Sequence, residues 1–423
     1  MPKTPERSAI VGWGSITPIG SDPWSTWQAA VAGRSGIRAL TESWSFDLPT
    51  RIAGRVPDTI FTKLEPILRR RSDRCTQLAL LAARQAWAMA LKRTPGVDPD
   101  RVAVVIGTGI GGLSTMHEQH MQLSDGGPSS VNPLTVPMLI PDAPAGQVAI
   151  DLEIHGGVHT PVSACASGAE AMMLAQMLLN DDRADLVLAG GAEAPINRLG
   201  LVGFSAMRAL SSRNNAPEQA SRPYSSNRDG FVLSEGAGIL ALTRDSDAPA
   251  GAALGWQLAG GISSDGHHIV APEPQGIQAS RAVEDALRRA DVDPADLCAI
   301  QAHATGTNLG DLAEARALKL SLGVVVEHLP VYAPKGQLGH LLGAAGSVEA
   351  ILGIQSLREG IVPQSINANP LDTEINLDVT ASGPVKLSSS EPERLMLKNA
   401  FGFGGHNVSL VLAAPCNIAE QRD

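Results

Sequence analysis

Two segments of the chain, ALKRTPGVDPDRVAVVIGTGIGG (residues 90–112) and ALRRADVDPADLCAIQAHATGT (residues 286–307), align with each other across a single gap. Each runs from the end of a helix through a VDP turn and a β-branched strand into a loop rich in glycine or threonine. A fainter echo pairs GAEAMMLAQMLLNDD, which follows Cys165, with GSVEAILGIQSLREG near Gly346. Both echoes keep the same order, and their spacing is too long for a solenoid repeat, so we predict two related halves.

Strand and helix patterns alternate along the whole chain. The predicted strands are SAIVGWG, RVAVVIGTG, ADLVLAGG, GILALT, WQLAGG, LCAIQAH and LPVYAP, and helical segments such as TQLALLAARQAWAMALKR, SRAVEDALRRA and VEAILGIQSLRE lie between several of them. This alternation is typical of an α/β protein with largely parallel, buried strands. We expect two similar α/β units, residues 1–250 and 251–423, which meet near residues 245–257 and pack face to face. Corresponding loops can then converge on one site.

The composition excludes several classes of protein. The chain of 423 residues has a net charge of −10, which disfavours nucleic acid as a partner. Its first residues lack the apolar core of a signal peptide, and no apolar run reaches the roughly 18 residues of a membrane span, so we expect a cytoplasmic protein without stable membrane insertion. The cysteines lack CxxC or metal-like spacing, which predicts neither a disulfide framework nor a metal site. They are Cys75, Cys165, Cys298 and Cys416.

The first candidate for chemistry is Cys165. The stretch PVSACASGAEAMMLAQMLLN, from Pro161, places it at the first turn of a helix that is apolar almost all the way round and therefore buried. Free N–H groups and the positive end of the helix dipole gather at such a turn, so we expect a lowered thiol pKa and a nucleophile. The alternative is a small buried core cysteine.

Three further loops carry polar groups beside glycines. His303 ends a predicted strand, Lys335 and His340 precede a Gly/Ala-rich helix, and NAFGFGGHN places Phe403 ahead of a closing strand. Taken singly, these could be core histidines, a helix start, a solvated lysine or a tight turn. Taken together with Cys165, they are the groups that a nucleophile with acid–base and oxyanion partners needs.

One motif points elsewhere. GTGIGG, at residues 107–112, follows a strand and formally matches the dinucleotide-binding pattern G-x-G-x-x-G. That pattern should open a helix, whereas the following LSTMHEQHMQLSDGGPSSVNP is expected to run into a polar loop that contains proline. The echo with AHATGT explains this segment better than nucleotide binding does.

Four motifs together carry a resemblance to a known family. SACASG, AHATGT followed by GD, PKGQLGH and NAFGFGGHN occur in an order and spacing that resemble the β-ketoacyl-acyl carrier protein synthases of the thiolase superfamily. Within it, the chain is most similar to the elongating type I/II enzymes of bacterial fatty-acid synthesis, and ASRPYSSNRDGFVLSEGAGIL adds to this likeness. The resemblance covers essentially the whole chain. It implies a five-layered αβαβα fold of two duplicated halves.

The resemblance implies a role for each motif. Cys165 matches the nucleophile that receives an acyl chain from acyl carrier protein as a thioester. His303 and His340 match the pair that assists decarboxylation of malonyl-acyl carrier protein, whose carbon then attacks that thioester and lengthens the chain by two carbons. The N–H groups of Cys165 and Phe403 match an oxyanion hole. Glycines on both sides, Gly402 and Gly404, allow this backbone to approach and let the Phe403 ring act as a gate.

The same resemblance assigns supporting residues. Lys335 matches a structural and electrostatic lysine, expected to pair with Glu314 or Asp311. Thr305 and Thr307 match hydroxyls that contact the pantetheine arm. No cofactor is implied beyond the phosphopantetheine that acyl carrier protein brings with it.

The implied partners are acyl carrier protein and a second copy of the chain. The carrier is acidic, so this acidic chain needs local cations to bind it. The alternative is that each candidate arginine is simply a solvated surface residue. The candidate docking residues are Arg69, Arg70, Arg71, Arg74 and Arg208. The family is dimeric, with the subunits joined through their sheets, and we expect a homodimer.

Small departures bear on the subfamily. HATGT leans toward polyketide synthases, whereas SACASG leans toward fatty-acid enzymes; Ser234 and Tyr224 replace an expected Gly and Phe. The alternatives are a ketosynthase of a type II polyketide or specialised lipid pathway and a non-catalytic partner like a chain-length factor, which would normally lack the cysteine. A thiolase or starter-unit synthase would lack His340. Chain length depends on pocket residues such as Met138 and Phe204.

Overall fold

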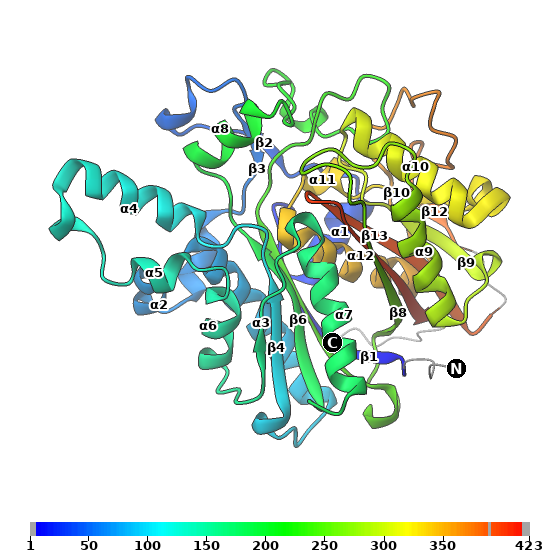
Figure 1. The fold of residues 1–423 in the computed structure, drawn as a ribbon. Helices are drawn as coiled ribbons and strands as arrows, with labels where there is room; N and C mark the ends of the chain where they lie inside the picture. Colours follow the sequence, from blue (N-terminus) through cyan, green and yellow to red (C-terminus); the bar gives the residue numbers. More distant parts are fainter. Residues whose placement is uncertain (1–5, 388–390, 417–423) are drawn as a thin grey trace.

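The computed structural model describes residues 6–387 and 391–416. A mixed sheet of ten strands runs through it in the order β10-β9-β13-β14-β8-β1-β7-β6-β4-β5 (Figure 1). These strands are β1 (Ser8–Ile16), β4 (Val102–Gly107), β5 (Val158–His159), β6 (Leu186–Glu193), β7 (Gly236–Arg244), β8 (Gly255–Ser264), β9 (Leu297–Gln301), β10 (Val331–Tyr332), β13 (Glu393–Gly402) and β14 (His406–Pro415). Two short pairs lie outside this sheet: β2 (Ile37–Ala39) with β3 (Ile52–Gly54), and β11 (Ile361–Val362) with β12 (Val385–Lys386).

The helices confirm the predicted alternation. They are α1 (Pro23–Val31), α2 (Pro66–Arg71), α3 (Arg74–Arg93), α4 (Leu113–Gly126), α5 (Thr135–Leu139), α6 (Ala143–Asp151), α7 (Ser167–Asn180), α8 (Arg198–Ala206), α9 (Ile277–Ala290), α10 (Asn308–Leu322), α11 (Lys335–Leu338) and α12 (Ala345–Glu359). The three helical segments recognised from sequence fall in α3, α9 and α12, and all seven predicted strands are present.

The strand order is the same in both halves of the sheet. Outward from the centre, one half runs β1, β7, β6, β4, β5 and the other runs β8, β14, β13, β9, β10. The halves join through a short antiparallel pairing of residues 8–10 with residues 255–257. The strands of the principal sequence echo, β4 and β9, therefore hold equivalent places, as the predicted duplication requires.

The prediction that the strands are largely parallel is wrong. β4 pairs in parallel with β5 and β6, and β9 does so with β10 and β13, but the pairs among the inner strands are antiparallel. Antiparallel neighbours need no helical crossover. β13 and β14 illustrate this, because residues 403–405 alone connect them.

Helices and sheet halves alternate in five layers. From left to right in Figure 1, these are α3 with α6, the β4 half of the sheet, α7 with α12, the β13 half of the sheet, and α9 with α10. Successive residues of one strand face different layers. Val104 belongs to the core beneath α3, whereas Val105 belongs to the central core around α7 and α12. The αβαβα arrangement implied by the resemblance is therefore confirmed.

Glycines bring the two central helices into contact near their N-termini. A Cβ on Gly168 would lie 2.8 Å from the carbonyl oxygen of Gly343, and a Cβ on Gly346 would lie 2.4 Å from the nitrogen of Ala169. A side chain at either glycine would force the helices apart. Because these glycines have no side chains, the starts of α7 and α12 can lie together at one site.

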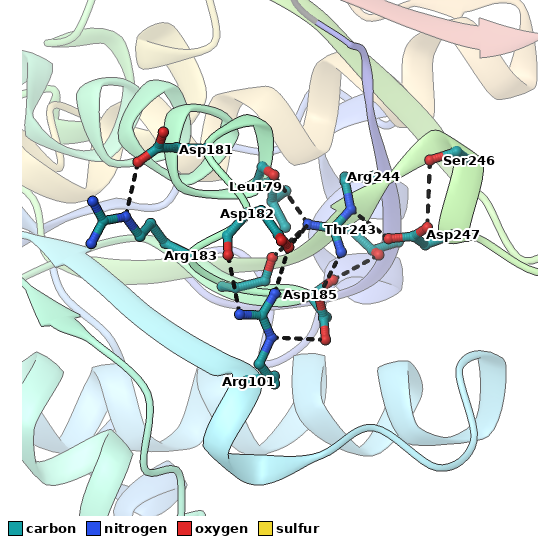
Figure 2. A network of polar contacts seen from close by, with 11 residues as sticks. Arg101, Leu179, Asp181, Asp182, Arg183, Asp185, Thr243, Arg244, Ser246 and Asp247 are labelled. Atoms are coloured by element: carbon teal, nitrogen blue, oxygen red, sulfur yellow. Dashed lines mark hydrogen bonds and ion pairs between the residues drawn. The ribbon is translucent and has the colours of Figure 1, made fainter.

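Ion pairs join the start of β4 to the end of β7 (Figure 2). Arg101 lies 2.6 Å from Asp182 and 2.9 Å from Asp185. Arg244 pairs with the same Asp185 and with Asp247. Because Arg101 precedes β4 and Asp185 precedes β6, this network aligns the strand ends opposite those that carry the reactive groups.

The predicted junction of the halves falls on the connection between β7 and β8, which ends one half at Arg244 and begins the other at Gly255. The outer ends of the predicted halves, residues 1–5 and 417–423, lie outside the described residues. Across the described part of the chain, no helix has the length and apolar character needed to cross a membrane.

Candidate active site

Cys165 lies in a single 3-10 turn, Ala164–Ala166, that leads directly into α7. Ala164 has a φ of 50°, a left-handed backbone that costs a residue with a Cβ about 1–3 kcal/mol. The Ser167 hydroxyl locks the turn, because it donates to the Ala164 carbonyl at 2.7 Å and accepts from the Ser163 N–H at 3.0 Å. The turn thereby places the thiol at the wall of a cavity of about 330 Å³.

The tip of the β13–β14 hairpin closes over this thiol. A Cβ on Gly402 would lie 2.5 Å from the Ser163 carbonyl oxygen and 3.2 Å from the Cys165 nitrogen, so this approach requires glycine. Gly404 has a φ of 85°, which also favours glycine. The Phe403 N–H is thereby directed at the Cys165 sulfur and hydrogen-bonds to it.

His303 lies two residues beyond β9, on a loop that two buried carboxylates hold. Glu314 accepts hydrogen bonds from the N–H groups of His303 and Ala304, at 2.8 and 2.7 Å. Asp311 accepts from the N–H groups of Gly306 and Tyr224, at 3.0 and 2.8 Å. Both acids therefore support the histidine loop.

The two departures from the family pattern are both buried and hydrogen-bonded. The Tyr224 hydroxyl lies 3.3 Å from Glu314, to which it donates. The Ser234 hydroxyl lies 2.9 Å from the carbonyl oxygen of Gly54 and 2.7 Å from that of Leu338, two residues before His340. Each hydroxyl thus adds a polar contact beside one histidine loop.

The backbone and the ring of His340 are both fixed. Its N–H donates to Val232 at 2.8 Å, and its carbonyl accepts from Ser234 at 3.0 Å. Its ring Nδ1 accepts the N–H of Leu342 at 3.3 Å. The proton of a neutral imidazole then belongs on Nε2, which leaves Nε2 as a donor toward other groups.

The three candidate groups line one cavity. Cys165, His303 and His340 all contribute to its wall, and the two imidazole centroids lie 5.5 Å apart with their planes nearly perpendicular. Phe231 packs on His340 and Phe401 on His303, at centroid distances of 5.2 and 5.8 Å. Burial, with Lys335 as a further cause, holds the pKa of each imidazole well below its ordinary value. Both histidines are therefore neutral at pH 7.

The expected lowering of the thiol pKa is wrong for the resting protein. Burial raises the pKa of Cys165 to about 12, although Lys335 and the Phe403 N–H act in the opposite direction. The nearby Glu193 carboxylate adds to the increase. Loss of hydration outweighs the helix start here, so the resting cysteine is a thiol and not a thiolate.

The predicted partner of Lys335 is also wrong. The Lys335 ammonium lies 2.6 Å from Glu349 on α12, and both side chains are almost fully buried. Glu314 and Asp311 are engaged with backbone N–H groups of the His303 loop instead. Lys335 thus links α11, which leads to His340, with α12 of the central layer.

The predicted pantetheine residues lie along the cavity wall. Thr305 and Thr307 both line it, and their hydroxyl oxygens are 3.0 Å apart. Phe204 packs edge-on against Phe231 with the centroids 5.6 Å apart, in the apolar cluster that also contains Cys165. Met138 lies on α5 and is not among the residues that line this cavity.

The candidate docking arginines separate into three groups. Arg208 is exposed and lines the cavity. Arg69, Arg70 and Arg71 are exposed on α2, which lies well apart from α8 and α10 (Figure 1). Arg74 binds Glu235 at 2.6 Å and Asp58 at 2.7 Å, so its charge serves an internal network.

Glu193, at the end of β6, is a site residue that the sequence reasoning missed. Its side chain is 1% exposed and accepts from the Gly109, Ile110 and Gly343 N–H groups at 2.6, 3.3 and 3.1 Å. Burial raises its pKa to about 7. The signal was an acidic residue that ends the otherwise apolar strand LVLAGGAE.

The GTGIGG loop contacts this same carboxylate. The prediction of a polar loop after it is wrong, because α4 begins at Leu113 and Pro128 follows its end. The Gly109 and Ile110 N–H groups, which a nucleotide phosphate would need, already bind Glu193. Residues 6–387 and 391–416 contain no group of three or more His, Cys, Asp and Glu side chains that could hold a metal ion.

Relatives with curated names match nearly the whole chain. The 3-oxoacyl-[acyl-carrier-protein] synthase 2 of Staphylococcus aureus strain N315 is 40% identical over 409 residues, which are 96% of this chain and 98% of the relative. The protein of the same name from Mycobacterium bovis is 38% identical over 406 residues, 95% of each chain.

Solved structures share the fold. A ketosynthase in complex with its type II polyketide acyl-carrier protein superposes with a TM-score of 0.88 at 27% identity, covering 97% of this chain and all of that one. A β-ketoacyl synthase from Burkholderia phymatum gives the same TM-score at 28% identity, with 97% and 100% coverage.

Two family models account for most of the sequence. The N-terminal domain of β-ketoacyl synthases matches residues 6–248, and the C-terminal domain matches residues 256–369. With the four loops gathered around one cavity, the chain belongs to the β-ketoacyl synthase family of condensing enzymes.

Proposed function

We propose that the protein is a cytoplasmic 3-oxoacyl-[acyl carrier protein] synthase that extends a fatty acyl chain by two carbons. The observation that carries this proposal is the meeting of one thiol and two neutral imidazoles in a single cavity, with a backbone N–H directed at the sulfur. Each half of the chain, residues 1–250 and 251–423, contributes part of that set.

In the first half-reaction, Cys165 takes the acyl group from acyl carrier protein. Its sulfur attacks the thioester carbonyl, the bond to the carrier sulfur breaks, and the thiol proton of Cys165 leaves with the carrier as its thiol. The N–H groups of Cys165 and Phe403 bind the carbonyl oxygen while it carries negative charge. Gly402 and Gly404 permit the backbone approach that this requires.

In the second half-reaction, malonyl-acyl carrier protein loses CO2. The C–C bond electrons move onto the malonyl thioester, whose oxygen accepts hydrogen bonds from the Nε2 atoms of His303 and His340. Two neutral donors are suited to this anion, since each is worth roughly 3–4 kcal/mol in such sites. The new carbon nucleophile attacks the Cys165 thioester, expels the thiolate and forms the 3-ketoacyl product.

The remaining groups support these steps. Lys335 acts on both imidazoles through its charge and contributes positive potential without contact to the substrate. Asp311 and Glu314 hold the His303 loop. Thr305 and Thr307 contact the pantetheine arm that carries each substrate into the cavity, so no other cofactor is required.

The carrier binds where its negative charge meets arginines. Arg208 lines the cavity and forms one contact, and the exposed arginines of α2, residues 69–71, form a second basic patch. Since α2 is distant from α8 in the same chain (Figure 1), we assign its patch to a carrier that enters the site of the partner subunit.

We further propose a homodimer joined along the sheet edge at β5. Both residues of β5 are exposed, and its backbone is unpaired on the side away from β4 in the strand order. Exposed apolar side chains are found on β5 and on the neighbouring segments α4, α5 and α6. They are Met116, Met121, Leu123, Val136, Ile150 and Val158. An uncovered strand edge beside such side chains is suited to pairing with a second copy.

The test is the intact mass of the protein after incubation with acyl-carrier proteins of graded length, beside a Cys165→Ala control. We expect one added acyl group, absent from the control, which malonyl-carrier protein then removes as a 3-ketoacyl product. Preference for polyketide intermediates over saturated chains would move the enzyme to a polyketide pathway. Absence of an adduct at every length would reject the enzyme and favour a non-catalytic partner.

A further inference from the structure

The central layer contains a buried carboxylate with a lysine on each oxygen. Oε1 of Glu349 lies 2.6 Å from the ammonium of Lys335, and Oε2 lies 2.9 Å from that of Lys398. Lys398 and Glu349 are completely buried, and Lys335 is almost so. The triad places two ammonium groups on one carboxylate in a region without solvent; burial lowers the pKa of Lys398, whereas Glu349 and the more distant Glu314 carboxylate act in the opposite direction. Buried charges are normally paired one to one, so a second lysine on the same carboxylate is a feature that needs an explanation.

Lys398 reaches this position from β13. It is on the same face of the strand as Met396 and Ala400, which belong to the central core. Its ammonium also donates to the Asn399 carbonyl at 2.6 Å, and the Asn399 side chain donates to Glu314 at 3.1 Å. Glu314 in turn holds the His303 N–H. The second lysine is therefore connected to the histidine loop as well as to α12.

The two lysines act on both cavity histidines. Lys335 and Lys398 each lower the imidazole pKa of His303 and of His340, in addition to the effect of burial. His340 has a geometric reason to stay neutral, because protonation of its Nδ1 would oppose the Leu342 N–H that this atom accepts. A positive charge close by disfavours that protonation and favours an anion in the cavity.

Other ionisable groups also surround the imidazoles. The triad residues Lys335, Glu349 and Lys398 come from α11, α12 and β13, whereas Cys165, Glu193 and Glu314 come from the turn before α7, from β6 and from α10. Farther along the cavity wall lie Arg208, Asp229, Asp265 and Glu273. Among these, Lys335 and Lys398 are the charges that act on both histidines.

We propose that Lys398 is a positioning residue for decarboxylation, whose charge keeps the two cavity histidines neutral and stabilises the anion that forms beside them. The inference rests on the proposed condensation reaction. Acyl transfer to Cys165 should depend on it much less, because Lys335 is the cation that acts most strongly on the thiol. The two half-reactions therefore separate this role from a general effect on folding.

The experiment compares Lys398→Met with wild type from pH 5 to 9. Decarboxylation of malonyl-carrier protein and acyl transfer to Cys165 are measured separately, and the Cε1 signals of His303 and His340 are followed by NMR. Removal of the charge should raise both histidine titrations and the acid limb of decarboxylation by about one pH unit. Decarboxylation at pH 7 should fall about tenfold, whereas acyl transfer should change less than twofold.

Three further variants make the result specific. Lys398→Arg keeps the charge and should retain the wild-type acid limb, and Lys398→Gln replaces Lys398→Met if the latter does not fold. Gln301, the register neighbour of Lys398 on β9, is fully buried, and its side-chain polar atoms have no hydrogen-bond partner. Gln301→Met therefore changes the same layer without a change of charge and should leave the histidine titrations in place.

Unchanged titrations and an unchanged acid limb in a folded Lys398→Met or Lys398→Gln protein would overturn the inference. So would an equal shift in Gln301→Met. A wild-type protein that neither decarboxylates malonyl-carrier protein nor accepts an acyl group would reject the proposed function itself. The histidine titrations, which require no turnover, would still report whether Lys398 controls these side chains.

Discussion

The two helices of the central layer, α7 and α12, begin with the same backbone turn but differ in what that turn presents. Ala164–Ala166 precedes α7 and Leu342–Ala344 precedes α12, each as a single 3-10 turn. The first residue of each turn has a left-handed backbone, with φ of 50° at Ala164 and 48° at Leu342. The second residue is Cys165 in one turn and Gly343 in the other.

The surroundings decide the difference. Cys165 faces the cavity. A Cβ on Gly343 would instead lie 2.5 Å from the Gly109 nitrogen and 2.8 Å from the Glu193 carboxylate. The turn before α7 thus presents a nucleophile to substrate, whereas Gly109 and Glu193 occupy the equivalent space beside the turn before α12. The comparison teaches that duplication reproduced the strained backbone, and that the side chain and its neighbours assigned the chemistry to one copy.

The equivalent loops after β4 and β9 show the same division. In the sequence echo, Thr108 aligns with His303 and Gly111 with Gly306. Both glycines have positive φ, 89° and 83°. Each loop is held by a buried carboxylate, Glu193 or Glu314. Only the second loop carries an imidazole toward the cavity, so the histidine is the functional addition to a shared frame.

The largest expected effect tests the difference between the turns that precede α7 and α12. Cys165→Ala should lower condensation by roughly a thousandfold or more, because no covalent acyl intermediate can form. Gly343→Ala should instead lower stability by about 1–3 kcal/mol through overpacking. Product formation by mass spectrometry and urea unfolding distinguish the two. A Gly343→Ala protein of unchanged stability would contradict the close packing of the α12 turn.

The next effect tests the loops after β4 and β9. His303→Ala should slow malonyl decarboxylation roughly 100- to 1,000-fold through loss of a donor to the anion, while acylation of Cys165 stays measurable. Thr108→Val, at the equivalent position, removes a hydrogen bond to Glu193 and should cost about 1–3 kcal/mol of stability with little change in decarboxylation. Release of CO2 is the readout. Equal losses in both variants would remove the functional distinction between the loops.

A pH effect on stability tests the buried carboxyl group of Glu193, which holds the loop after β4. Burial raises the pKa of Glu193 to about 7 in the folded protein, above the ordinary 4.5 of the unfolded chain. Its contribution to stability is therefore complete below pH 4.5 and is lost as the pH rises through 7. The unfolding free energy of wild type relative to Glu193→Gln should fall by on the order of 3 kcal/mol across that range. Urea titrations at several pH values measure it, and a constant difference would contradict the buried carboxyl.

The smallest expected effect concerns a place where the halves differ at the surface. Arg101 pairs with Asp182 and Asp185, whereas its equivalent in the echo is Asp296. Arg101→Ala should destabilise by less than about 1 kcal/mol, because these pairs are partly exposed. Thermal unfolding at low and high salt measures this. A larger loss would mean that the ion-pair network of Figure 2 stabilises the N-terminal half more strongly than the exposure of its side chains indicates.

Much of the site could be predicted because its residues stand at positions with local sequence signals. Cys165 precedes an apolar helix, His303 follows a strand, and Phe403 lies among glycines, all of which periodicity and turn residues reveal. Strand direction could not be predicted, since parallel and antiparallel buried strands have similar apolar runs. α4 was missed because Pro128, which suggested a loop, lies just beyond the helix end.

The residues that the sequence reasoning misplaced are those whose partners lie on another element that packing brings close. Lys335 on α11 pairs with Glu349 on α12, and Arg74 on α3 is engaged by Glu235. The direction of the Cys165 pKa shift was likewise wrong, because burial is a property of the assembled layers. No local pattern reports how much water reaches a side chain or which charge lies across a sheet.

The sequence by itself determined the duplication, the alternation of strands and helices, and which residue types stand at the strand ends and helix starts. These follow from local periodicity, from turn residues and from comparison of the chain with itself. Only the tertiary structure decided the mixed strand directions, the neutral thiol, the hydrogen bonds of Glu193 to backbone N–H groups and the two lysines on Glu349. Each of these depends on long-range packing, which removes water and brings charges from separate elements to within about 3 Å of one another.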